Sequence, residues 1–127
     1  MIDKETFLKK LKDLKLVLKP NQNVISLDTL NRIYKKMQHG IKFIPINVSS
    51  DNLIVEGHHR YVGSIIAGYD LEHVPDYPTP TVLNDIEWKD VEFLDIKYDT
   101  PDKVDRLNRL DALYNDMSIK DIENIIK

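Results

Sequence analysis

Five consecutive residues of this chain combine the side chains that phosphate chemistry uses. An arginine carries a permanently charged fork that matches two phosphate oxygens. A histidine can be neutral or charged near physiological pH, as a proton-transfer group must be. A carboxylate can act as a base or help to hold magnesium. The chain offers all three in one segment, the 56–60 turn, which consists of Glu56, Gly57, His58, His59 and Arg60.

The elements expected on either side of the turn favour anion binding. Residues 53–55 predict a short apolar strand, and residues 58–67 predict a helix closed by Gly68. The first amides of a helix have no internal partners, and its dipole favours a negative group there. Gly57 permits the strand-to-helix turn and a close approach of a ligand to the backbone. The catalytic candidates are therefore Glu56, His58 and His59, and the phosphate-binding candidates are Gly57, His59 and Arg60.

Each of these residues also has a purely structural interpretation. Glu56 could favour the helix dipole without transferring a proton. His58 could be a solvated residue at a helix start, and Arg60 could form a surface ion pair. These alternatives stay open at the level of sequence.

Residues elsewhere in the chain could add to such a site. Lys35, Lys36 and Lys42 could reach a polyphosphate, although solvation explains them nearly as well. Adjacent histidines on a helix point about 100° apart, so a dedicated zinc site is not expected. A magnesium ion held by one carboxylate and the phosphates of the ligand fits the turn better. The acidic residues that could complete its shell are Asp51, Asp85 and Asp95.

Apolar spacing predicts two helices before the turn. The first runs to Leu18, and the second begins at Ser26 or Asp28 and ends before Gly40, which suits a left-handed terminating residue. The residues expected on their buried sides are Phe7, Leu11, Leu14, Leu18, Leu30, Ile33, Tyr34 and Met37.

Three more strands are predicted from β-branched and alternating residues. They cover residues 41–48, 71–75 and 90–98. The alternation changes phase between Phe93 and Leu94, which predicts a bulge there.

Two helices are predicted at the C-terminal end. Thr100 followed by Pro101 is typical of a helix start, and Ser118 with Asp121 predicts a second one. The residues expected on their buried sides are Val104, Leu107, Leu110, Tyr114, Ile119, Ile122 and Ile126.

Residues 28–75 resemble the ParB/sulfiredoxin superfamily. The resemblance lies in a helix, a strand that contains Pro45, Ile46 and Val48, and then the 56–60 turn with its acidic-Gly-x-His-Arg pattern. It implies a small α+β domain over residues 1–127, with a short mixed sheet, flanking helices and a helical C-terminus. It also implies that ATP or another nucleotide binds through Gly57, His59 and Arg60.

The turn departs from two branches of that superfamily. Sulfiredoxins carry a catalytic cysteine where this chain has His58, and the chain contains no cysteine, so sulfiredoxin chemistry is excluded. No helix-turn-helix is seen after Pro75, so a centromere-binding partition protein is not expected. The turn is closer to the ParB-like nuclease and free-serine-kinase branches. In those kinases, an acidic residue at the position of Glu56 and a histidine in the turn take part in catalysis. The resemblance therefore implies catalytic roles for Glu56 and for a histidine of the 56–60 turn.

The composition and charge distribution of the chain bear on its partners and its location. Residues 1–48 hold ten Lys and Arg against four Asp and Glu, whereas residues 49–127 hold eight against seventeen, and the whole chain carries −3. The basic first part could meet a polyanion, or its lysines could be solvated helix faces. We expect neither a signal peptide nor a membrane anchor. We do expect a cytoplasmic location.

Three hypotheses about function follow. The first is an enzyme that cleaves a phosphodiester or phosphoanhydride, or transfers a phosphoryl group, on a nucleotide or nucleic acid. The second is a non-catalytic module for nucleotide sensing or protein binding, with residues 85–99 and the acidic C-terminal part as the partner surface. The third is the catalytic domain of an effector toxin.

Overall fold

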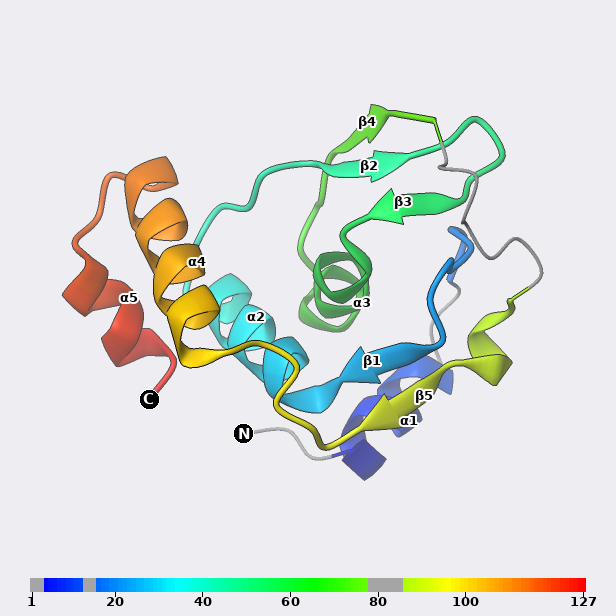
Figure 1. Ribbon diagram of the computed structural model, residues 1–127, viewed down its shortest axis with the longest axis horizontal. Coiled ribbons are helices and arrows are strands. Elements are labelled where there is room, and N and C mark those ends of the chain that lie inside the picture. Colours follow the sequence, from blue (N-terminus) through cyan, green and yellow to red (C-terminus); the bar gives the residue numbers. More distant parts are fainter. Residues whose placement is uncertain (1–3, 13–15, 78–85) are drawn as a thin grey trace.

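The chain folds into a small α+β domain with short sheets (Figure 1). The computed structural model describes residues 4–12, 16–77 and 86–127. In chain order, the elements are α1 (Lys4–Lys12), β1 (Val24–Ser26), α2 (Leu27–Gln38), β2 (Ile46–Val48), β3 (Ile54–Glu56), α3 (His58–Ala67), β4 (His73–Pro75), the 3-10 helix η1 (Trp88–Asp90), β5 (Glu92–Leu94), α4 (Pro101–Tyr114) and α5 (Ile119–Ile125).

The strands form two separate sheets. In the three-stranded sheet, β2 lies between β3, to which it is antiparallel, and β4, to which it is parallel. In the two-stranded sheet, β1 pairs in parallel with β5 and brings Ile25 opposite Phe93. The pairing of β1 with β5 joins residues that are nearly 70 positions apart, and sequence analysis did not predict β1.

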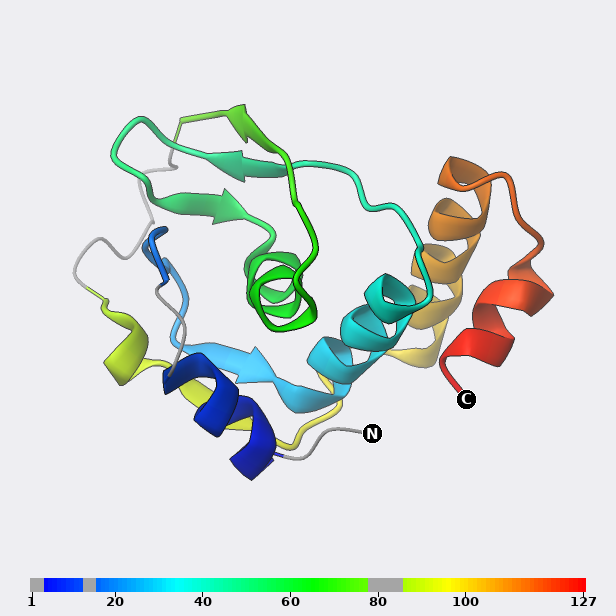
Figure 2. The same ribbon diagram turned by 180° about the vertical axis from the view of Figure 1, so that it is seen from behind.

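Helix α3 lies between the two sheets (Figures 1 and 2). Val62 packs in the core cluster that contains Phe7 and Phe93, whereas its neighbour Tyr61 packs in the cluster that contains Ile46 and Leu71. Successive residues on a helix point in different directions, so one helix contributes to both clusters. The start of α3 is therefore supported from both sides.

Helices α2 and α3 approach each other closely at Gly63. A Cβ atom at this position would lie 2.8 Å from Ile33 Cγ2, which is closer than packed carbon atoms tolerate. The absence of a side chain at Gly63 thus allows the close spacing between α3, which follows the 56–60 turn, and α2.

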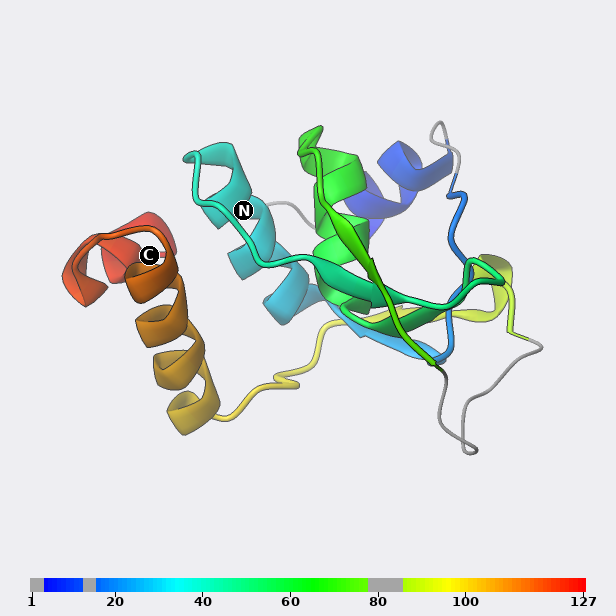
Figure 3. The ribbon, with the colours of Figure 1, turned by 90° about the horizontal axis from the view of Figure 1, so that it is seen from above.

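Helices α4 and α5 lie at the end of the molecule opposite the sheets, with α2 between them and α3 (Figure 3). Their apolar contact with the rest of the chain centres on a small cluster of three buried residues, Ile41, Ala112 and Ile122, and ion pairs add to it. Thr100 and Ser118 cap the two helices by accepting from the amides of Lys103 and Asp121, as predicted.

The predicted first helix is too long. The described part of α1 spans Lys4–Lys12, and residues 16–18 are not helical. Leu18 is buried in the cluster that contains Ile46, its amide donates to the Tyr61 hydroxyl at 3.1 Å, and the next residue bridges to Leu53. Leu14 lies outside the described residues. The predicted second helix is confirmed, with Ser26 as its N-cap and Gly40 at φ +80° just beyond it.

The three strands predicted over residues 41–48, 71–75 and 90–98 are also too long, because β2, β4 and β5 cover only 46–48, 73–75 and 92–94. Strand β2 begins only at Ile46, because Ile41 packs beneath α4 and α5 and the Phe43 amide donates to the Tyr69 hydroxyl. The predicted bulge between Phe93 and Leu94 is wrong, since both residues pair with β1 in an unbroken register.

The predicted buried side of α4 is wrong in part. Leu110 and Tyr114 are 55% and 53% exposed, whereas Asn108 and Ala112 are buried. The apolar stripe of this helix faces a cleft and not a core, as described below.

Candidate functional site

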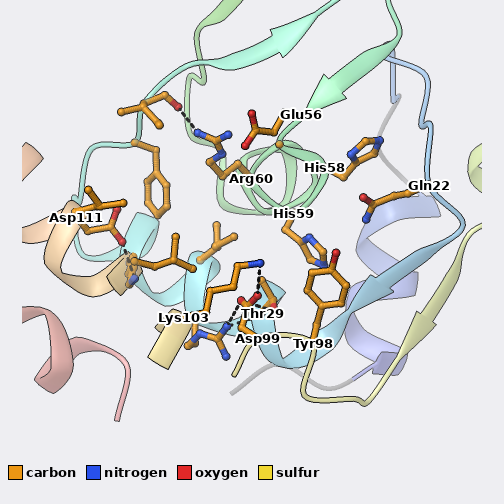
Figure 4. Close-up of a pocket in the computed structure, with 18 of the residues that line it drawn as sticks. Gln22, Thr29, Glu56, His58, His59, Arg60, Tyr98, Asp99, Lys103 and Asp111 are labelled. Carbon is orange, nitrogen blue, oxygen red and sulfur yellow. Dashed lines mark hydrogen bonds and ion pairs between the residues drawn. The ribbon is translucent and has the colours of Figure 1, made fainter. Parts of the chain in front are cut away.

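A cleft of about 480 Å³ separates the beginning of α3 from α4 (Figure 4). All five residues of the 56–60 turn line it. Helix α2 forms its floor, and the segment 98–99 with the inner face of α4 forms the opposite wall. The turn predicted from sequence is thus brought into one cavity, together with side chains that sequence analysis did not assign to it.

Gly57 sets the shape of the turn. Its φ angle is +109°, a left-handed conformation that residues with a side chain rarely adopt. A Cβ atom here would overlap with Ile46 Cγ2. Gly57 occupies the N-cap position of α3 and has no side chain with which to cap the helix. The start of a ten-residue helix therefore faces the cleft with its dipole uncompensated by a cap.

Arg60 extends from the first turn of α3 toward the segment before β2. Its guanidinium donates to the carbonyl of Ile44 at 3.1 Å and, at 3.5 Å, to that of Pro45. Burial lowers the pKa of Arg60, and the charges of Glu56 and Asp111 act in the opposite direction. An arginine stays charged despite such a shift, so Arg60 brings a full positive charge into the cleft.

The other cations of the cleft are paired. Arg32 lies 2.6 Å from Asp99, Lys103 lies 3.0 Å from the same carboxylate, and Lys36 lies 2.6 Å from Asp111. Among the residues that the structure describes, no carboxylate lies within 4.0 Å of the Arg60 guanidinium. Arg60 is therefore the cation best placed to meet an anionic ligand.

Both histidines of the turn accept hydrogen bonds from the backbone. His58 Nε2 accepts from the Asn21 amide at 2.9 Å, and His59 Nε2 accepts from the Ser26 amide at 3.0 Å. A ring nitrogen that accepts carries no proton, so a neutral ring bonded in this way holds its proton on Nδ1. The two imidazoles thus attach the segment before α2 to the start of α3.

The surroundings keep both imidazoles neutral. Burial lowers the pKa of His58 to about 4, with a further contribution from His59. Burial also lowers the pKa of His59 to about 4; the charge of Asp99 opposes this, while Lys103 and Arg32 reinforce it. At neutral pH neither ring is an acid, and each offers an Nδ1–H donor.

Asp99 organises the opposite wall although sequence analysis did not single it out. Its side chain is 2% exposed and accepts from Thr29, Arg32 and Lys103. Burial alone would raise the pKa of Asp99, but the hydrogen bonds from Lys103 and Thr29 and the nearby positive charges hold it below its ordinary value. The only sequence signal was its position immediately before the Thr100 cap.

The wall formed by α4 gives the cleft an apolar side. Leu107, Leu110 and Tyr114 line it, together with Phe43 and Ile44 from the segment before β2. Charged groups and an apolar surface that meet in one cavity suit a ligand with an anionic head and an apolar or aromatic body.

Of the additional residues that sequence analysis considered, only some line the cleft. Lys36 lines the cleft, whereas Lys35 and Lys42 do not. Asp51 and Asp95 do not line it either, and Asp85 lies outside the described residues. Within the described part of the chain, no group of three His, Cys, Asp or Glu side chains is arranged to hold a metal ion.

Comparisons with known proteins return no match. No family model matches the chain, and neither the curated proteins nor the solved structures give a significant match. In the described ranges, no helix is both long and apolar enough to cross a membrane.

Proposed function

We propose that this domain binds the phosphate of a nucleotide or nucleic acid at the 56–60 turn and cleaves a phosphodiester or phosphoanhydride, or transfers a phosphoryl group. The observation that carries the proposal is the combination of Arg60, a charged group without a carboxylate partner among the described residues, and the uncapped start of α3 in the same cleft. Each feature favours an anion, and together they favour one with several oxygens.

The proposal includes membership of the ParB/sulfiredoxin superfamily, close to its ParB-like nuclease branch. What supports it is the succession of β3, a left-handed Gly57 and α3 beside a short mixed sheet, with helices at the C-terminal end. A cytoplasmic location belongs to the same proposal, because a chain without cysteine suits a reducing compartment.

The side chains of the turn have distinct roles in the proposed reaction. Arg60 and the first amides of α3 hold phosphate oxygens, and the His59 Nδ1–H donates a hydrogen bond to one of them. Glu56, which is exposed at the edge of the cleft, is the base or the carboxylate that helps to hold magnesium. When ATP or another nucleotide is the ligand, magnesium neutralises charge on its phosphates. His58 contributes mainly through its bond to the Asn21 amide.

The experiment is a substrate panel of ATP, ADP, CTP, and single- and double-stranded DNA and RNA, each with magnesium. We expect turnover of one substrate, and a decrease of about 100-fold in Arg60→Ala because a charged donor to the reacting group is lost. Arg106→Ala is the matched control, since Arg106 is an exposed arginine on α4 that does not line the cleft. Full activity in both Glu56→Gln and His59→Ala would show that the catalytic roles are wrong.

A second candidate function is nucleotide sensing without catalysis. It is favoured by the two histidine Nε2 atoms, both of which already accept from backbone amides and so have no free lone pair for a proton. Binding that Arg60→Ala abolishes, without turnover of any substrate, would support this candidate. The absence of both binding and turnover would contradict both and favour a protein-binding module that acts through the acidic C-terminal part.

A further inference from the structure

Lys36 is the most buried of the paired cations that line the cleft. Its side chain, on α2, is 5% exposed, and its Nζ donates to Asp111 at 2.6 Å and to Asn108 at 2.8 Å. Asp111 belongs to α4, is 20% exposed, and lines the same cleft. The ion pair therefore forms part of the cleft wall, where an entering anion meets it.

We propose that Lys36 is a second anion subsite, which Asp111 closes in the free protein and which a ligand opens by displacing that carboxylate. The ligand class is a polyphosphate, or another molecule with at least two anionic groups. This inference rests on the proposed function, because the first anionic group is the one held at Arg60. Asp111 then acts as an internal competitor of the ligand.

Burial explains why Lys36 can exchange one anion for another. A buried ammonium group is costly without a counter-charge, so it must stay paired in both states. A phosphate oxygen that replaces the Asp111 carboxylate keeps Lys36 paired. Asp111 is open enough to solvent to be hydrated once it is released.

The neighbouring ion pairs are not suited to the same exchange. Asp99 is 2% exposed and accepts from Arg32, Lys103 and Thr29. Displacing it would leave a buried carboxylate without its donors, which is unfavourable. The partly open Asp111 is therefore the carboxylate of the cleft that a ligand can replace, and Lys36 is the cation it exposes.

The test measures binding of tripolyphosphate and of orthophosphate by calorimetric titration. Asp111→Asn keeps the shape of the side chain and removes the competing charge. We expect it to bind tripolyphosphate about tenfold more tightly, a coupling of ordinary size between charged groups. The affinity for orthophosphate, which has one anionic group and binds at Arg60, should rise much less, because the charge of Asp111 acts on Arg60 without an ion pair between them.

Two further variants make the test specific. Asp105→Asn, the control, removes a carboxylate from the same helix, but one that pairs with Arg109 on the exposed side and does not line the cleft. It changes the net charge equally and should leave both affinities unchanged. Lys36→Met has a similar shape without the charge; it should weaken tripolyphosphate binding alone and remove the gain from Asp111→Asn when the two are combined. It also keeps the test decisive if Asp111→Asn does not fold.

The inference is overturned if folded Asp111→Asn binds tripolyphosphate no more tightly than Asp105→Asn does. It is also overturned if Asp111→Asn gains equally for orthophosphate, or if Lys36→Met leaves tripolyphosphate binding intact. Failure of the proposed function has a different signature, because Arg60→Ala would then bind orthophosphate as well as the unaltered protein does. The two failures are therefore distinguishable in one set of titrations.

Discussion

The wall of the cleft that carries the 56–60 turn rests on two core clusters, whereas the wall formed by α4 rests on one small cluster and several ion pairs. On the first wall, Tyr61 and Val62 anchor α3 in the two larger clusters. On the second, Ala112 and Ile122 pack with Ile41, and Lys36 reaches across to Asp111. Apolar packing favours a single arrangement, while ion pairs at a cavity wall can exchange partners.

The two walls of the cleft therefore have different roles. The turn wall presents a preformed geometry, fixed by Gly57 and by the two histidine bonds to the backbone. The α4 wall supplies the apolar surface and the carboxylates that a ligand must accommodate or displace. Substitutions in the first wall should therefore affect the whole fold, and those in the second should act locally.

The largest effect is expected for Gly57→Ala. The added methyl group would overlap with Ile46 Cγ2, and the turn holds this position in a left-handed conformation that alanine rarely adopts, so we expect a loss of about 4 kcal/mol in the free energy of unfolding. Gly40→Ala is the matched control, because Gly40 also has a positive φ but no atom within 4 Å of an added Cβ; it should lose about 1 kcal/mol. Urea unfolding measures both, and equal losses would show that packing around the turn is not tight.

A smaller effect per side chain is expected on acidification. Since the pKa of His58 and of His59 is lowered from 6.5 to about 4 in the folded chain, the unfolded chain binds more protons below pH 6.5. The free energy of unfolding should thus be highest above pH 6.5 and fall by about 3 kcal/mol for each of the two histidines as the pH decreases towards 4. The pKa of Asp99 is held below its ordinary value, so its ion pairs persist over this range and the loss arises on the turn wall.

Urea unfolding at successive pH values measures this dependence. A variant with both His58→Gln and His59→Gln should show a much flatter profile between pH 6.5 and 4, because it lacks the two titrating groups. If the double variant keeps the full slope, other groups are responsible and the two imidazoles are not buried as described.

Sequence analysis predicted the turn wall well because its signals are local. Residues 54–67 follow one another as strand, left-handed glycine and helix, and Gly57 and Gly68 mark the two ends of the helix. The Thr100 cap was predicted for the same reason, because a hydroxyl followed by proline marks a helix start whatever surrounds it.

The α4 wall was predicted less well because its features depend on distant residues. Leu110 and Tyr114 have helical spacing, but spacing alone does not distinguish an apolar stripe that faces a core from one that faces a cleft. The pairing of Asp99 with Arg32 joins positions 67 residues apart, and no local pattern marks it. Strand β1 escaped prediction for the same reason, since three residues are too few to show a period and β5 lies far along the chain.

The smallest effect is expected for Thr100→Ala. Its hydroxyl accepts from the Lys103 amide at 3.2 Å, and the loss of such an N-cap destabilises a helix by about 1 kcal/mol. If the α4 wall opens independently of the turn wall, this loss should appear as faster amide hydrogen exchange in α4 and α5, with little change in α3. Ser26→Ala is the counterpart, because Ser26 caps α2, which packs against α3, and should speed exchange in the body of the domain as well. Equal acceleration in α3 and α4 by Thr100→Ala would mean that the two walls unfold together, and the division between a fixed and an adjustable side of the cleft would have to be abandoned.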